Sequence, residues 1–223
     1  MPGMFMKGAF IQLTKKGPVP VPDLIVFQYN PETIEHTWDQ SDSGGGGAKA
    51  GSYSNPQAAS GKPDESFSFT LQMDANDSIA DGSRIARISG VYTRLAALEM
   101  LIFPVKVEEE LVGATGAKNA CEVPQFLLPT VLFVWGPGRI LPVRVTSLGI
   151  TEKLFDKFLN PTHVEAKIGL RVLKPEELAV AAQAHDPLAK VGMVAYSYTH
   201  GLRQLLAVAN LANAVGDVGM SPL

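Results

Sequence analysis

Two segments of this 223-residue chain alternate strictly between apolar and polar side chains, and this pattern limits the possible folds more than any other feature. In residues 65–75 every second position is apolar: Phe67, Phe69, Leu71 and Met73. Residues 163–173 repeat the pattern with Val164, Ala166, Ile168, Leu170 and Val172. A period of two is typical of a strand with one face in the core and one in solvent. The chain is therefore expected to build its core on a β-sheet.

Other short apolar segments predict further strands, joined by turns rich in glycine and proline. These strands lie at 7–14, 23–29, 34–38, 130–135 and 141–151. The run TVLFVW at 130–135 is continuously apolar, which predicts a strand buried on both faces. Because prolines lack a backbone donor, Pro18, Pro20 and Pro22 predict that 15–22 is a turn without ladder pairing. The connections at 136–139 and 153–162 are short, so neighbouring strands are predicted to be antiparallel.

The hydrophobic period changes to three and four residues in the helical regions. Residues 83–103 predict one amphipathic helix of about five turns, with Ser83 as its N-cap. Pro175 is the predicted first residue of a short helix, and residues 192–215 predict an apolar helix that Gly216 ends. That last helix either packs on its own domain or docks on another subunit. We therefore expect an α+β domain over residues 1–175 and a C-terminal helical extension over 176–223.

Composition favours a protein that is covered by other subunits. Charged residues make up 18% of the chain, against roughly 25% in an average soluble domain. The deficit indicates surface buried in an assembly, or else ordinary variation in a chain rich in alanine and glycine. Residues 41–62 predict a flexible loop with four consecutive glycines, which either orders on a neighbouring subunit or is a flexible insertion.

Charge and hydropathy set limits on partners and location. The net charge of −3 gives no general attraction to nucleic acid or anionic lipid. No segment approaches the roughly 20 apolar residues that span a bilayer, and residues 1–10 lack the apolar core of a secretion signal. We expect cytoplasmic synthesis, no nucleic-acid partner and no membrane insertion.

The residue types that usually carry catalysis are scattered. The histidines form no paired metal-ligand spacing: His36, His163, His185 and His200. His163 and Glu165 share a strand face, where an ion pair in solvent explains them better than a metal does. Cys121 is the single cysteine and has no adjacent histidine, which predicts an inert thiol. We therefore predict no catalytic residue, no metal and no cofactor in a non-enzymatic domain that works by assembling.

Two blocks of sequence carry a resemblance to a known family. The first, LIVFQYNPETIEHTWDQ at 24–40, holds the motif residues Phe27, Asn30, Pro31, Glu32 and Ile34. The second, at 129–173, contains an apolar strand that ends in Trp135 and Gly136, followed by a returning hairpin and a closing strand. Both blocks, with the predicted helix between them, resemble the contractile injection system tube protein, N-terminal domain family, over most of residues 5–175.

The resemblance implies a phage-tail-tube-like fold, an antiparallel β-barrel or sandwich with one packed helix. It also implies a structural baseplate subunit of a phage-tail-like contractile machine related to type VI secretion. Such a subunit forms a hexameric ring that joins the spike to the inner tube and initiates tube assembly. Its partners would be a VgrG-like spike protein, an Hcp-like inner-tube protein and other baseplate subunits. The particle would assemble in the cytoplasm and be extracellular or membrane-docked when mature.

Longer members of that family carry a peptidoglycan-binding LysM module, which residues 176–223 lack, so cell-wall binding is not implied. Ring contacts are expected from the loop 41–62, the strand edges near 67–73 and 163–173, and the last helix. The interface residues expected there are Phe67, Phe69, Tyr198, Leu202 and Leu205. The alternatives are a tail-tube or tube-terminator protein of a contractile phage-like particle and, from a different class, a cell-wall-binding module. A tube protein would polymerise alone into stacks, whereas a wall-binding module would need an aromatic platform or convergent carboxylates.

Overall fold

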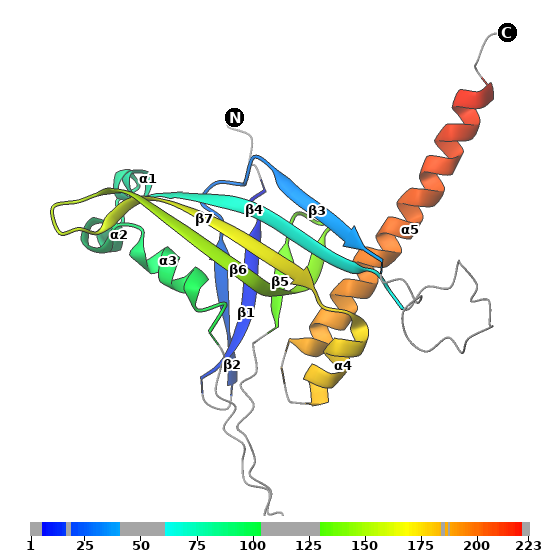
Figure 1. The fold of residues 1–223 in the computed structure, drawn as a ribbon, viewed down its shortest axis with the longest axis horizontal. Helices are drawn as coiled ribbons and strands as arrows, with labels where there is room; N and C mark the ends of the chain where they lie inside the picture. The colour runs from blue at the N-terminus through cyan, green and yellow to red at the C-terminus, as the bar shows by residue number, and fades with distance from the viewer. Residues whose placement is uncertain are drawn as a thin grey trace, which may run out of the picture.

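The chain folds into one antiparallel sheet with helices at both ends. The computed structural model describes residues 6–16, 19–40, 61–103, 130–183, 186 and 188–219. Its strands are β1 (Ala9–Lys16), β2 (Val19–Val26), β3 (Ile34–Asp39), β4 (Asp64–Asp74), β5 (Val131–Val134), β6 (Ile140–Phe155) and β7 (Pro161–Val172). They pair in the order β2-β1-β5-β6-β7-β4-β3 (Figure 1). The predicted α+β class and the antiparallel pairing are confirmed.

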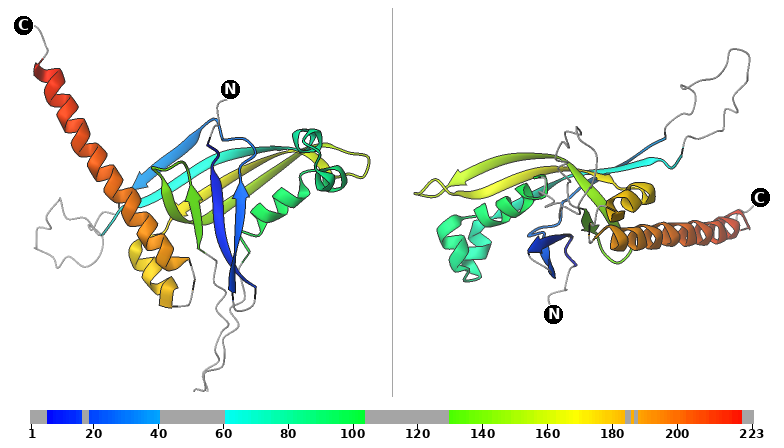
Figure 2. Two further views of the ribbon diagram at one scale, coloured as in Figure 1. Left: turned by 180° about the vertical axis from the view of Figure 1, so that it is seen from behind. Right: turned by 90° about the horizontal axis from the view of Figure 1, so that it is seen from below.

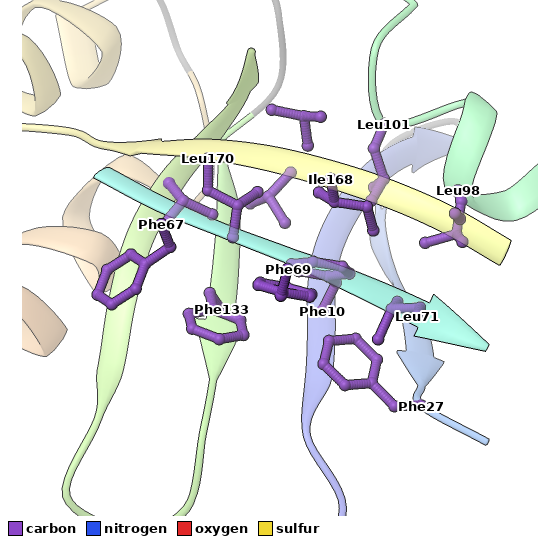
Figure 3. Packing of buried hydrophobic residues seen from close by; sticks show 14 of the residues in the cluster. Phe10, Phe27, Phe67, Phe69, Leu71, Leu98, Leu101, Phe133, Ile168 and Leu170 are labelled. Carbon is purple, nitrogen blue, oxygen red and sulfur yellow. The ribbon is translucent and has the colours of Figure 1, made fainter. Parts of the chain in front are cut away.

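The sheet curls until its β1–β2 end packs face to face with β4. The ring centroid of Phe10 on β1 lies 6.3 Å from that of Phe69 on β4, and Phe27, which follows β2, lies 5.9 Å from Phe69 (Figure 3). Phe133 of β5 fills the space between these ends, 5.5 Å from Phe69. In the described residues β2 and β3 are the edges and do not pair with each other. The expected barrel or sandwich is therefore replaced by a single open, curled sheet.

Side chains hold the two ends of the curl together where no backbone ladder forms. The Gln28 side chain donates to the Asp74 carbonyl oxygen at 2.8 Å and accepts from the Asp74 N–H at 3.0 Å. The Tyr29 hydroxyl donates to the Asp77 carboxylate, and this bond raises the pKa of Tyr29 to about 12. These contacts place the segment after β2 beside the end of β4 and the start of α1.

The period-two predictions are confirmed by burial. All four apolar residues predicted for β4 are 2–4% exposed, and those of β7 are 0–2% exposed. The strand predicted to be buried on both faces is β5. Its Val131 and Phe133 lie in the main core, while Leu132 lies in a second cluster with Leu188 and Ala195.

The predicted turn at 15–22 is wrong, because β1 and β2 pair as far as Lys16 and Val19. Pro20 and Pro22 lie within β2. Because β2 is an edge strand, backbone groups of every second residue point away from β1 and need no partner in the sheet. The prolines also protect this edge against pairing with another chain.

Two short helices replace the single helix predicted for 83–103. They are α2 (Arg84–Ser89) and α3 (Tyr92–Glu99), which follow the short helix α1 (Ala75–Ala80), and Ser83 caps α2 as predicted. Gly90 breaks the helix with φ at 58°, and a Cβ there would clash with the carbonyl oxygen of Pro161. That same carbonyl accepts the Val91 N–H at 3.1 Å. The break reorients α3, so that Leu95 and its neighbours on this helix face the core.

Two helices follow the sheet: α4 (Pro175–Gln183) and α5 (Ala189–Gly219). Pro175 begins α4 as predicted, but α5 continues through Gly216 to Gly219, so the predicted stop at Gly216 is wrong. The first half of α5 packs on α4 and β6, and the second half extends away from the body (Figures 1 and 2). Among the described residues, no helix combines the length and the apolarity needed to span a bilayer.

Removing a ring from the curl should unfold the protein far more readily than removing an exposed ring. Phe10 is fully buried, whereas Phe158 is 72% exposed. We expect Phe10→Ala to lower the free energy of unfolding by about 3–5 kcal/mol, and Phe158→Ala by less than about 0.5 kcal/mol. Urea unfolding followed by circular dichroism measures both. Equal losses for the two variants would contradict the proposed core.

Candidate functional site

The motif residue Asn30 has a structural part in the fold. Its side-chain oxygen accepts the Gly8 N–H at 2.9 Å, and its amide nitrogen donates to the Met6 carbonyl oxygen at 2.9 Å. The Phe27 N–H donates to the Gly8 carbonyl oxygen at 2.9 Å. Asn30 therefore fastens the segment after β2 to the segment before β1. Of the other first-block motif residues, Ile34 packs on the core, Pro31 is half-buried and Glu32 is exposed.

The structure brings the two blocks of motif residues together. The rings of Phe27 and Trp135 lie 6.4 Å apart, and Gly8 lies between them. A Cβ on Gly8 would come within 2.7 Å of both rings, so only glycine allows this close approach. Gly136 lies in the turn after Trp135, where the Trp135 N–H donates to the Arg139 carbonyl oxygen at 2.8 Å.

Two predictions about the interface are wrong. Phe67 and Phe69 are 2% and 4% exposed, so these side chains belong to the core and cannot contact another subunit. The strand β7 is paired on both sides and offers no edge, whereas β4 pairs with β3 only over residues 64–69, so in the described residues its part at 70–74 is paired with β7 alone. The remaining expected residues lie on α5, where Tyr198 and Leu205 are exposed and Leu202 is half-buried. Residues 41–60, Cys121 and His185 lie outside the described residues.

A buried carboxylate anchors α5 to the sheet. Glu65 at the start of β4 is 3% exposed and accepts both terminal nitrogens of Arg203, at 3.0 and 2.5 Å. The Nε2 atom of His36 lies 2.9 Å from the same carboxylate. The Arg203 guanidinium also lies 5.0 Å from the centroid of the Trp38 ring. This cluster ties a residue in the middle of α5 to β3 and β4.

The electrostatics of this cluster shift two neighbouring pKa values. Burial lowers the pKa of His36, and the nearby Arg139 and Arg203 charges add to that effect, while Glu65 opposes it. Burial also lowers the pKa of Arg139, whose guanidinium lies 5.5 Å from the centroid of the Phe67 ring. The Glu65 carboxylate is engaged by both Arg203 and His36, so it holds α5 against β3 and β4.

The alternation pattern of β4 could have marked Glu65 as an acidic residue at a buried position. Positions 65, 67, 69, 71 and 73 share the core-facing side of β4, and Glu65 is the one acidic residue among them. A carboxylate on a buried face requires a cationic partner. The partner, Arg203, lies 138 residues further along the chain, so the sequence alone could not identify it.

The first half of α5 docks on the hairpin formed by β5 and β6. The Thr199 side chain is 1% exposed; its hydroxyl donates to the Ile140 carbonyl oxygen at 2.8 Å and accepts the Ile140 N–H at 3.2 Å. The Tyr198 hydroxyl donates to the Pro137 carbonyl oxygen at 3.1 Å. The sequence left open whether this helix packs on its own domain or docks on another subunit. In the structure, the first half of α5 packs on its own domain, and the second half extends away from the body.

Two exposed apolar surfaces lie at opposite ends of the molecule (Figures 1 and 2). The distal segment, residues 204–219 of α5, carries side chains that are 60–69% exposed: Leu205, Leu206, Val208 and Leu211. The hairpin tip, residues 154–159 at the end of β6 and in the turn to β7, carries side chains that are 52–79% exposed: Leu154, Phe155, Phe158 and Leu159. Clusters of exposed apolar side chains mark interaction sites.

The described residues hold little that resembles a reactive centre. A hollow of about 250 Å³ beside α1–α3 is lined by Ser78, Asp81, Ser83 and Arg94, with further residues of these helices. On β7, the Glu165 carboxylate forms an ion pair with Lys153 at 2.5 Å, while the Nε2 atom of His163 lies 4.0 Å from the same carboxylate. Within the described part of the chain, no three His, Cys, Asp or Glu side chains gather as a possible metal site.

Comparison with known proteins identifies no family. Neither a protein-family model nor a curated protein sequence matches this chain. The functional argument therefore depends on the geometry of the surfaces described above.

Breaking the buried ion pair should destabilise the fold. In Arg203→Met the Glu65 carboxylate keeps only His36 as a partner, so we expect the free energy of unfolding to fall by about 3 kcal/mol. The control Arg144→Met removes an exposed arginine of β6 and should cost less than about 0.5 kcal/mol. Adding Glu65→Gln to Arg203→Met should recover part of the loss, which a double-mutant cycle measures. Additive losses in that cycle would contradict a direct interaction.

The lowered pKa of His36 predicts a pH dependence of stability. Below an unfolded-state pKa of about 6.5 the unfolded chain binds a proton at this histidine more readily than the folded chain does. Stability should therefore fall as the pH decreases from about 7 through 6.5 towards the lower folded-state pKa. Urea midpoints measured between these pH values should show a weaker dependence in His36→Asn than in the wild type. If the urea midpoint changed with pH equally in His36→Asn and in the wild type, the pH dependence of stability would come from other groups.

Proposed function

We propose that this chain is a non-enzymatic structural subunit that forms a ring in a phage-tail-like contractile injection system, joining the spike to the inner tube. The observation that carries the proposal is the position of the two exposed apolar surfaces, the distal segment and the hairpin tip, at opposite ends of the body. Unlike surfaces at opposite ends favour head-to-tail association, which gives a ring when the rotation between neighbours closes.

The resemblance supports the contractile-system part of the proposal. Its motif residues Phe27, Asn30 and Trp135 meet around Gly8, where they fix the start of the curled sheet. We therefore take the motif as a determinant of the fold, and we interpret the open sheet with its packed helices as a variant of the phage-tail-tube-like fold. A hexamer and a place between spike and inner tube follow from the resemblance.

The low charged fraction of the chain agrees with a subunit that is covered on several sides. Of the described residues, many large apolar side chains outside the two surfaces are also more than half exposed, among them Leu24, Ile88 and Met100. Neighbouring layers of a particle would bury such positions, whereas an isolated monomer would leave them in water.

Electron microscopy combined with light scattering tests the proposal. We expect the purified chain to form single closed rings of six subunits as its concentration rises, and to bind the ends of inner tubes when the tube and spike proteins are added. Stacked rings formed by the chain alone would favour the tail-tube alternative. Monomers under all of these conditions would refute the proposal.

A further inference from the structure

We propose that Arg139 and Arg203 together form a binding site for a carboxylate, beside the exposed ring of Trp38. The site lies where the end of β3 meets the middle of α5 (Figure 1), next to the start of β4 and the turn after β5. The inference goes beyond the proposed function, because it assigns a ligand to residues that otherwise fasten α5 to the sheet. It does not depend on self-association of the chain.

The pairing of β3 with β4 places both guanidinium groups over one face of the sheet. Trp38 lies opposite Glu65, and the Arg203 guanidinium both donates to Glu65 and lies 5.0 Å from the centroid of the Trp38 ring. The Arg139 guanidinium lies 5.5 Å from the centroid of the Phe67 ring, two residues further along β4. Such positions share a face and lie about 7 Å apart. A carboxylate that accepts N–H groups at about 2.8 Å from two guanidiniums fits between groups at this spacing.

The Arg139 guanidinium is the part of the cluster that lacks a partner. Within the described part of the chain it forms no hydrogen bond and no ion pair, although the side chain is half-buried. Burial and the nearby Arg203 charge both lower the pKa of Arg139. A partly buried cation beside a second cation is unfavourable, because it loses water without gaining an opposite charge. A bound anion would relieve this repulsion.

The formal charge of the cluster favours an anion that carries one negative charge. Arg139 and Arg203 contribute two positive charges, and Glu65 contributes one negative charge. Burial lowers the pKa of His36, which keeps its imidazole neutral near pH 7. One carboxylate therefore neutralises the cluster, whereas a phosphate dianion would leave an excess negative charge. The planar fork of a guanidinium also matches the two oxygens of a carboxylate.

The site is accessible from solvent. The side chains of His36 and Arg203 are 25% and 32% exposed, and Trp38 is 46% exposed. In the described residues no fully buried polar side-chain atom lacks a partner, so the free N–H groups of Arg139 reach the surface, where a ligand can meet them. The flat Trp38 ring can cover an apolar group attached to the carboxylate. A free carboxylic acid and an acidic side chain of another protein both supply this chemistry.

The fluorescence of Trp38 can report binding in the full chain. Trp135→Phe leaves Trp38 as the single tryptophan, and its emission should change with sodium acetate relative to sodium chloride at equal ionic strength. In this background, Arg139→Met should weaken acetate binding by about tenfold or more, since one guanidinium is lost. Arg139→Lys keeps the charge but not the fork and should weaken it about threefold. The control Arg144→Met, on the exposed face of β6, should bind acetate as the parent does. Circular dichroism confirms that each variant is folded.

Two blocked peptides distinguish a free carboxylate from a protein side chain as the source of the ligand. Acetyl-glycyl-glutamyl-glycine amide carries its single carboxylate on a side chain, and the glutaminyl peptide is the matched control without that charge. Binding of the glutamyl peptide about tenfold tighter than acetate, with no binding of the glutaminyl peptide, would identify an acidic side chain of a partner. Binding no tighter than that of acetate would identify a free carboxylate. Both results support the site.

Three other results overturn the inference. The first is an equal effect of acetate and chloride on the emission of Trp38, and the second is unchanged acetate binding in Arg139→Met. The third is tighter binding of inorganic phosphate than of acetate, which would contradict the assignment to a single negative charge. All of these titrations use dilute protein, so their failure leaves the proposed function standing. The proposed function fails separately, if the chain forms no rings.

Discussion

The contact between phenylalanine rings from the two ends of the sheet determines the shape of the whole molecule. Phe10 and Phe27 from one end meet Phe69 from the other, with Phe133 between them. Each ring removes about 150–250 Å² from water, which is enough to hold the sheet in a strong curl. A register shift between Val145 and Ser147 lets the long strand β6 bend along this curl. The two ends that remain outside the curl, the hairpin tip and α5, are the ends that carry exposed apolar side chains.

The strands that could be predicted are those whose pattern depends on local geometry alone. The alternation around Phe69 and Ile168 survives in the fold because a strand presents every second residue to the core whatever its neighbours are. The single helix at 83–103 could not be predicted correctly, since the carbonyl oxygen of Pro161, a residue far along the chain, leaves no room for a side chain at Gly90 and accepts the Val91 N–H. Likewise, prolines in 15–22 break a ladder only in an interior strand, and the sequence does not reveal that β2 is an edge.

The candidate surfaces could be predicted only in part, because core and interface residues share the same chemistry. Phe67 and Leu205 are both large and apolar, and only the fold shows that one is 2% and the other 69% exposed. The sequence indicated that α5 is apolar but not where it leaves the body, which depends on Thr199 and on the ion pair of Arg203 with Glu65. The turn at 154–159 was predicted as a simple connection, since the left-handed backbone of two leucines in this segment leaves no trace in the sequence pattern.

The buried ion pair of Arg203 with Glu65 fixes the direction in which α5 leaves the body. This direction determines where the exposed distal segment of α5 lies. From Arg203 to Gly219 the helix extends 16 residues, or about 24 Å at 1.5 Å per residue. A change of about 10° at the anchor would therefore move the far end by about 4 Å, nearly the rise of one helical turn. Whether head-to-tail contacts close into a ring or continue as an open helix depends on such small rotations. A bidentate arginine with little freedom in its geometry is thus well suited to the anchor position, because it fixes the angle on which closure of the ring depends.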